Sequence, residues 1–219
     1  MIKDGLQGPA DLFRNATVTD SRIAGDKSGV GKMKVVVITP ENPFDGETEQ
    51  IKQVIGCGVF RLHLRHPKAD EQTLRGIIEG LTAEERKKIV LHDCYNLVDE
   101  YNLGGAHLNG RHPELAEICT SRSCHSLEEV ATSKNLQYCF LSPIFDSISK
   151  VGYASNFTPE VLIQAKADGI INENVIALGG ITVDKLDLVR EYGFGGVAIL
   201  GSAWKDEIAQ IEIIKQMMV

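Results

Sequence analysis

Short apolar runs alternate with helix-like stretches along most of this chain. From Lys34 onward we count eight runs rich in β-branched or apolar residues, each followed by a helical pattern. The runs are nearly continuous in apolar character, as expected of parallel strands that are covered on both faces. The predicted strands are Lys34 to Thr39, Val59 to Arg65, Ile89 to Asp93, Ala106 to Asn109, Cys119 to Cys124, Tyr138 to Leu141, Val175 to Leu178 and Gly196 to Leu200.

Several of the predicted helices carry start or stop signals. Ser126 to Glu129 has the spacing of a capping box, and Thr158-Pro159 combines an N-cap with proline at the first helical position. Gly193 stands where a C-terminal stop is wanted. Eight strand-helix units predict a (β/α)8 TIM barrel of the α/β class.

The domain organisation follows from the same pattern. We expect residues 33–219 to form a single barrel domain of about 185 residues, which is short for this fold, so some helices must be short. A doubly wound open sheet is the alternative, although no G-x-G-x-x-G follows the first strand. Residues 1–32 hold few clustered apolar residues and predict a poorly ordered extension, with Met33 as an alternative start.

Composition narrows the class of protein. The 219 residues carry a formal net charge of -7, which disfavours nucleic acid or an anionic membrane as a partner of the whole surface. The five cysteines contain no C-x-x-C pair, so neither a disulfide framework nor a zinc site is indicated. Without a signal peptide or a membrane-spanning apolar run, the sequence predicts a cytoplasmic protein.

In a TIM barrel the functional residues lie at the carboxyl ends of the strands. The seventh predicted strand runs into Gly179-Gly180 and the eighth into Leu200-Gly201. Glycine lets backbone N–H groups approach a ligand closely, and phosphate sites recur after these two strands. Tight turns alone would also explain the glycines, but their shared position predicts a phosphate site.

A long polar segment follows the sixth predicted strand. About fifteen residues separate it from the helix that begins near Thr158, whereas such connections usually have two to six. Ser147, Ser149 and Lys150 offer two hydroxyls and one ammonium group, which suit an oxyanion. A solvated surface loop is the alternative interpretation.

A series of short motifs runs through the chain from about Lys34 to the C-terminus. They are Leu62-His63-Leu64-Arg65, His92-Asp93, Gly105-Ala106-His107-Leu108, Ser123-Cys124-His125-Ser126, Ser142-Pro143-Ile144-Phe145, Ala177-Leu178-Gly179-Gly180 and Gly195-Gly196-Val197-Ala198. In order and spacing, this series resembles the thiamine phosphate synthase/TenI family. The resemblance implies a barrel enzyme of thiamine biosynthesis. It also implies a thiazole phosphate ligand and, commonly, a homo-oligomer.

The synthase branch joins a pyrimidine diphosphate to a thiazole phosphate with Mg²⁺. The resemblance assigns Arg65 and Lys150 to the pyrophosphate and Asp93 to the metal. Pro67 replaces a lysine, with Lys68 adjacent, and His112 replaces the second metal-binding aspartate. His92 replaces an asparagine beside Asp93. Because Mg²⁺ prefers oxygen ligands, these departures count against synthase activity.

The TenI-like branch keeps the thiazole phosphate pocket but aromatises a thiazole tautomer, which requires no cofactor. Its proton carrier is a histidine that His125 matches. Imidazole suits both halves of a proton transfer near neutral pH. We therefore expect a tautomerase, with His125 catalytic and Arg65, His92, Asp93, Ser147, Ser149, Lys150, Gly179, Gly180, Leu200 and Gly201 binding substrate.

Two further hypotheses stay open. The first is thiamine phosphate synthase itself, and the second is a non-catalytic barrel that binds thiamine precursors. Among the other histidines, we expect His63 and His107 to be structural, and His66 to flank the mouth of the barrel.

Overall fold

The computed structural model describes residues 33–111, 118–146, 157–200, 204 and 207–218. The predicted extension over residues 1–32 lies outside this range. All strands and helices given below lie within the described residues.

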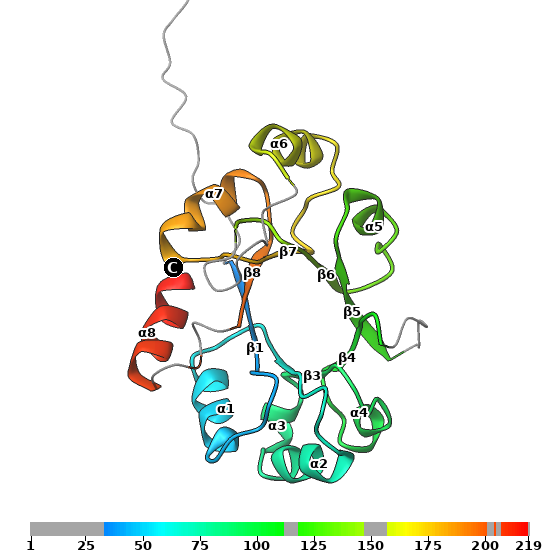
Figure 1. Ribbon diagram of the computed structural model, residues 1–219, viewed down its shortest axis with the longest axis vertical. Helices are drawn as coiled ribbons and strands as arrows, with labels where there is room; N and C mark the ends of the chain where they lie inside the picture. Colours follow the sequence, from blue (N-terminus) through cyan, green and yellow to red (C-terminus); the bar gives the residue numbers. More distant parts are fainter. Residues whose placement is uncertain (1–32, 112–117, 147–156, 201–203, 205–206, 219) are drawn as a thin grey trace, which may run out of the picture. The chain divides into compact units, whose positions relative to one another are not determined.

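Eight parallel strands close into a barrel in sequence order, and each strand pairs with the next (Figure 1). The ring is completed where β1 pairs with β8, for instance Val36 beside Ala198. The strands are β1 (Lys34–Ile38), β2 (Arg61–Leu64), β3 (Ile89–Leu91), β4 (Gly105–Leu108), β5 (Cys119–Cys124), β6 (Tyr138–Leu141), β7 (Val175–Leu178) and β8 (Gly196–Ile199). The closed ring confirms the TIM barrel and excludes the open sheet.

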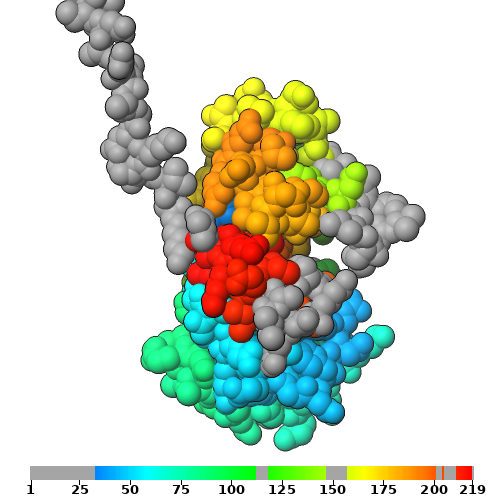
Figure 2. Space-filling view, turned by 90° about the vertical axis from the view of Figure 1, so that its left-hand side faces the viewer, coloured from blue at the N-terminus to red at the C-terminus, as the bar shows by residue number. Residues whose placement is uncertain are grey.

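Helices surround the barrel, and several are short, as the chain length predicts. Between β4 and β5, residues 112–117 lie outside the described range. The helices are α1 (Glu47–Gly56), α2 (Glu71–Glu79), α3 (Ala83–Arg86), α4 (Asn96–Glu100), α5 (Leu127–Ala131), α6 (Pro159–Ala167), the 3₁₀ helix η1 (Val183–Lys185), α7 (Leu186–Glu191) and α8 (Glu207–Met217). Figure 2 shows α8 between α7 and α1 on one side of the barrel. None of the helices described is long and apolar enough to cross a membrane.

The apolar side chains of the strands pack into two separate hydrophobic clusters. Val35 and Val37 of β1 join the shell between strands and helices, whereas Val36 and Ile38 point into the barrel. The interior cluster is completed by β6, β7 and β8 through Tyr138, Phe140, Ile176 and Ala198. Fully burying one such aliphatic side chain contributes about 1.5–3 kcal/mol, so strands covered on both faces are strongly favoured.

The other half of the interior is polar. His63 on β2 reaches the rings of Tyr138 and Phe140 on β6, with centroid distances of 5.8 and 4.9 Å. His107 on β4 also packs against Phe140, at 4.9 Å. Contacts between these distant strands run through the inside of the barrel, so both histidines are interior residues.

The predicted helix signals are mostly confirmed. Thr158 caps α6 by accepting a hydrogen bond from the N–H of Val161, and Gly193 takes φ 83° just after α7. The capping box at Ser126 is only half formed. Ser126 accepts from Glu129 N–H, but the Glu129 carboxylate accepts from the N–H of His125 at 2.6 Å. A complete capping box occurs instead at Thr82 and Glu85.

Candidate active site

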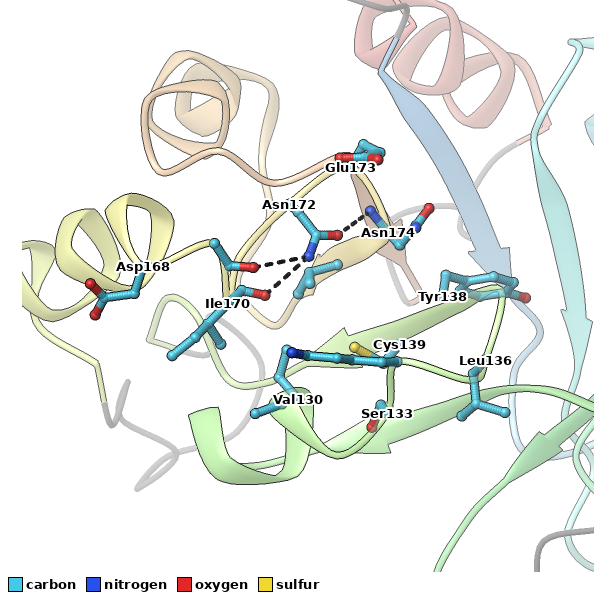
Figure 3. A pocket seen from close by; sticks show the side chains of 14 residues that line it. Val130, Ser133, Leu136, Tyr138, Cys139, Asp168, Ile170, Asn172, Glu173 and Asn174 are labelled. Atoms are coloured by element: carbon cyan, nitrogen blue, oxygen red, sulfur yellow. Dashed lines mark hydrogen bonds between the residues drawn. The ribbon is translucent and has the colours of Figure 1, made fainter.

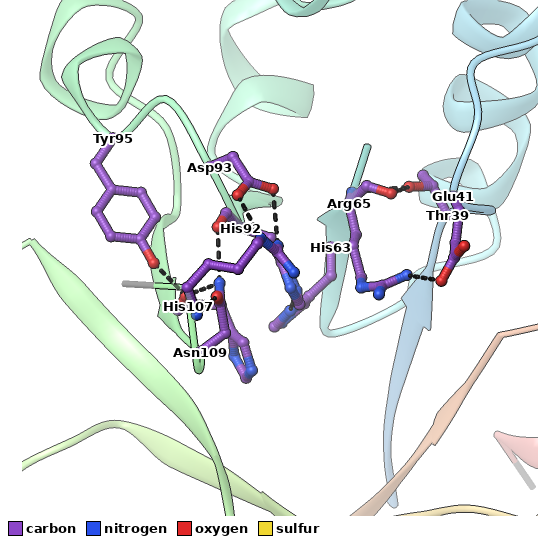
Figure 4. Close-up of polar contacts among 10 residues, drawn as sticks. Thr39, Glu41, His63, Arg65, His92, Asp93, Tyr95, His107 and Asn109 are labelled. Carbon is purple, nitrogen blue, oxygen red and sulfur yellow. Dashed lines mark hydrogen bonds and ion pairs between the residues drawn. The ribbon is translucent and has the colours of Figure 1, made fainter. Parts of the chain in front are cut away.

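Arg65 lies at the mouth, immediately after β2. Its backbone N–H donates to Thr39 Oγ1 at 2.8 Å, which ties it to the end of β1. Its guanidinium pairs with the Glu41 carboxylate at 3.1 Å (Figure 4). The side chain stays one-quarter exposed, so the cation is held at the rim within reach of solvent.

Asp93 follows β3 and is held by an arginine that the sequence reasoning did not single out. Arg111 Nε and Nη2 donate to the two oxygens of Asp93 at 3.0 and 2.9 Å. Asn109 supports this corner by donating from Nδ2 to the His92 carbonyl at 2.7 Å (Figure 4). A bidentate arginine–carboxylate pair is a strong, directional contact, so it occupies the carboxylate.

His92 is buried rather than open to a ligand at the rim, with only 5% of its surface exposed. Its Nε2 shares a hydrogen bond with His63 Nδ1 at 2.8 Å, and its ring stacks on His107 at 4.3 Å. Burial, reinforced by the charge of His107, lowers the pKa of His92 well below its usual value. Its predicted role as a direct substrate contact is therefore not supported by its surroundings.

His66 also differs from the expectation that it flanks the mouth. It is buried with Glu47, the first residue of α1, and its Nε2 lies 2.9 Å from Glu47 Oε1. Because both side chains are almost fully buried, this contact connects α1 to the loop after β2 in the protein interior.

His125 lies just after β5, where α5 begins. Its Nδ1 is 3.1 Å from the carbonyl oxygen of Ser142, which can only accept, so Nδ1 carries the proton. In a neutral ring, Nε2 then carries the lone pair. The Glu129 carboxylate fixes the backbone of His125, and the imidazole is exposed. The side chain is thus oriented but accessible.

The Gly179-Gly180 turn packs against the segment after β6, which also contacts His125 through the Ser142 carbonyl. Both glycines have positive φ, 98° and 63°. A methyl group added at Gly179 would come within 2.9 Å of the Pro143 Cα, and one at Gly180 within 2.5 Å of the Asp146 carbonyl oxygen. Close packing of the segments after β6 and β7 therefore explains the glycines, while their role in phosphate binding stays a prediction.

Two further residues at the rim were not foreseen. Lys185 of η1 donates from Nζ to the Gly180 carbonyl at 2.9 Å, which places a cation at the glycine turn. Trp204 donates from Nε1 to the Ile38 carbonyl at 2.7 Å, at the end of β1. The sequence contains only one signal of the contact between Lys185 and Gly180, which is a lysine shortly after the Gly-Gly pair.

Some predicted site residues lie outside the described part of the chain. Leu200 is described and partly exposed, directly after β8. The residues that fall outside are Ser147, Ser149, Lys150, Gly201 and His112. Their predicted roles stay predictions.

A cavity of about 410 Å³ opens at the opposite end of the barrel (Figure 3). It is lined where β6 and β7 begin, by residues such as Leu136, Tyr138 and Asn172. Barrel enzymes place their chemistry at the carboxyl ends of strands, so this cavity is separate from the candidate site.

The closed parallel ring with charged and imidazole side chains at its carboxyl ends defines a TIM-barrel enzyme. The chain belongs to the TMP-TENI family, described as thiamine monophosphate synthase, whose family model matches residues 35–203. This confirms the resemblance inferred from the motifs and places the protein among enzymes of thiamine biosynthesis.

Individual relatives agree with this assignment. A thiamine-phosphate synthase of Yersinia pestis (strain Pestoides F) is 25% identical over 181 residues, covering 74% of this chain and 83% of the relative. The crystal structure of thiamine phosphate pyrophosphorylase from Bacteroides thetaiotaomicron has 34% identity and a TM-score of 0.76, covering 84% of this chain and 95% of that one. The Pyrococcus furiosus thiamine phosphate pyrophosphorylase, at 19% identity and a TM-score of 0.67, supports the fold alone.

Proposed function

We propose that this chain is a thiazole phosphate tautomerase of the TenI-like branch. The observation that carries the proposal is the bidentate contact between Arg111 and Asp93. It occupies the carboxylate that the synthases use for their metal. A proton shift needs no metal, so the chemistry of the TenI-like branch is compatible with this contact.

The remaining donors in this corner also fit Mg²⁺ poorly. Magnesium prefers oxygen ligands and near-ideal octahedral geometry. The chain has His112 where the synthases have their second aspartate, and the residue before Asp93 is a buried histidine. The residues present therefore do not fit the ion that the synthase reaction requires.

In the proposed reaction His125 acts as base and then as acid. Its Nε2 lone pair removes a proton from a ring carbon of the substrate, and the electron pair of that bond moves into the ring. The same nitrogen then returns the proton to the carbon outside the ring that was joined to it by a double bond, and this shift of the double bond into the ring leaves the thiazole aromatic. Ser142 holds Nδ1–H throughout and so keeps Nε2 as the reacting atom.

The glycine turn is the proposed phosphate site. Ser142 contacts His125, and its neighbour Pro143 packs against Gly179, so the turn and the imidazole flank one segment. Lys185 adds a positive charge to the turn, and Arg65 faces solvent at the rim. Ser147, Ser149, Lys150, Leu200 and Gly201 complete the proposed pocket.

Thiamine phosphate synthase is the second candidate, because the relatives reported above carry that activity in their names. In that reaction a pyrimidine diphosphate would be the second substrate and Mg²⁺ the cofactor. Assays with both substrate sets therefore separate the candidates.

The decisive experiment compares wild type with His125→Ala. Tautomerisation of the carboxythiazole phosphate is followed by NMR, and pyrophosphate release is measured with and without Mg²⁺. We expect metal-independent tautomerisation that His125→Ala abolishes and free imidazole partly restores. Thiazole phosphate should still raise the Tm of the variant, because its phosphate contacts are intact.

Three results would contradict the proposed tautomerase activity or the proposed role of His125. Robust Mg²⁺-dependent pyrophosphate release without tautomerisation would establish the synthase. An unchanged tautomerisation rate in His125→Ala would exclude His125 as the proton carrier. Ligand-induced stabilisation without turnover of any substrate pair would indicate a non-catalytic binding barrel.

We also propose the localisation, oligomeric state and partners of the enzyme. A cytoplasmic enzyme is favoured by the cysteine pattern, and homo-oligomers are common in the resembling family. The partners are small molecules; the acidic net charge disfavours nucleic acid.

A further inference from the structure

Three histidines from neighbouring strands converge inside the polar half of the barrel. His63 is on β2, His92 directly follows β3, and His107 is on β4. Each offers one ring nitrogen, and these three atoms lie within 4.8 Å of one another. The exposed fractions of the residues are 0%, 5% and 0%. We call this group the histidine cluster.

We propose that the histidine cluster is a binding site for a divalent transition metal, with Zn²⁺ as the best match. Zinc is bound by imidazole nitrogen in three-histidine sites that keep a fourth position open. Imidazole also suits copper and nickel, whereas Mg²⁺ prefers oxygen. The cluster is distinct from the rim carboxylate Asp93, whose partner is Arg111.

Outer hydrogen bonds hold two of the rings in orientation. His63 Nε2 contacts the Tyr138 hydroxyl at 2.6 Å, so its Nδ1 is the nitrogen that faces His92. His107 Nδ1 contacts Ser121 Oγ at 2.8 Å and its Nε2 contacts Ser123 Oγ at 2.9 Å, so a bound ion would replace one of these two contacts and leave the other in place. Metal-binding histidines typically have their second ring nitrogen held in this way, which sets both orientation and basicity.

The geometry requires only small movements. Zn–N bonds of 2.0–2.1 Å in a tetrahedral site place ligand nitrogens about 3.3 Å apart. His63 Nδ1 and His92 Nε2 are now 2.8 Å apart and share a hydrogen bond, which the ion would replace. The other separations, within 4.8 Å, must shorten.

The test is metal titration of the full chain after treatment with a chelator. We expect one equivalent of Zn²⁺ or Co²⁺ to bind at the histidine cluster and raise the Tm, and Mg²⁺ not to compete for this site. His63→Gln and His107→Gln should each weaken Zn²⁺ binding at least 100-fold. Tyr138→Phe, which removes only the supporting hydroxyl, should weaken it about 10–100-fold.

Two matched controls locate the site. His125→Gln removes an imidazole outside the cluster, and Asp93→Asn removes the rim carboxylate, so both should bind Zn²⁺ like wild type. The Co²⁺ spectrum of wild type should show tetrahedral nitrogen coordination without thiolate charge-transfer bands. If a histidine variant does not fold, this spectrum and Tyr138→Phe decide the question.

Several outcomes would overturn the proposal. These are no stoichiometric Zn²⁺ binding, binding that survives in folded His63→Gln or His107→Gln, and a thiolate-type Co²⁺ spectrum. The first would make the cluster a hydrogen-bonded core network, and the others would move the ion to a different site.

Discussion

The Asp93 carboxylate receives both donors of the Arg111 guanidinium, at 3.0 and 2.9 Å. The two residues come from consecutive strand ends, after β3 and after β4. Asp93 is the more sheltered partner, with 18% of its side chain exposed against 40% for Arg111. A positive charge therefore stands where a metal would approach this carboxylate.

Removing that charge should favour Mg²⁺. We expect Arg111→Ala to raise the apparent Mg²⁺ affinity roughly tenfold, because a nearby cation no longer opposes the ion. Arg111→Lys should have a smaller effect, since it keeps the charge but loses the two-pronged geometry. Isothermal titration with Mg²⁺ measures both, and equal affinities in wild type and Arg111→Ala would contradict the inference.

The buried histidines predict a loss of stability in acid. The folded-state pKa of each lies below the unfolded value of about 6.5, and for His107 it is about 3. Between these values the unfolded chain binds more protons, so stability is fully present above about pH 6.5 and falls as the pH drops. The slope is up to about 1.4 kcal/mol per pH unit for each histidine.

Urea unfolding between pH 7.5 and 5 measures this slope. We expect His107→Asn to reduce the slope of the unfolding free energy against pH by roughly the contribution of one histidine, because asparagine does not titrate. Wild-type and variant stabilities that run parallel with pH would show that His107 binds as many protons in the folded state as in the unfolded state.

Much of the fold could be predicted from the sequence. The bounds of β5, β6 and β7 agree with the predicted runs, because residues such as Cys139 and Phe140 are buried on opposite faces of the same strand. Where predicted strands were too long, as at Arg65 and Asp93, the extra residues are polar side chains at the rim. An apolar run marks a strand but not the point where pairing stops.

The site could be predicted only in part. The position of Arg65 and Asp93 at the rim follows from strand order, but their partners Glu41 and Arg111 depend on how loops from neighbouring strands meet. The burial of His92 was missed because a residue next to a strand end can point either way. Such contacts are set by three-dimensional packing that periodicity does not encode.

The buried pair of His66 and Glu47 should be important for stability. Removing one partner of a buried polar contact typically costs about 1–3 kcal/mol, because the other polar group is left in the core. We expect Glu47→Leu alone to destabilise the protein by about that amount. The double variant Glu47→Leu, His66→Leu should cost less than the sum of the single changes, as measured by urea unfolding. Strict additivity would show that the two residues do not interact.

Gly180 and Gly76 provide a matched pair for testing the turn after β7. Gly180 has φ 63°, and an added methyl group would lie 2.5 Å from the Asp146 carbonyl, whereas Gly76 is an exposed residue of α2 with open space around it. Gly180→Ala should therefore destabilise the protein by at least about 1 kcal/mol, while Gly76→Ala should stabilise it by about 0.5–1 kcal/mol. If the turn also binds phosphate, Gly180→Ala should weaken thiazole phosphate binding and Gly76→Ala should not. Equal stabilities for the two variants in thermal unfolding would mean that the turn can relax around the added methyl group.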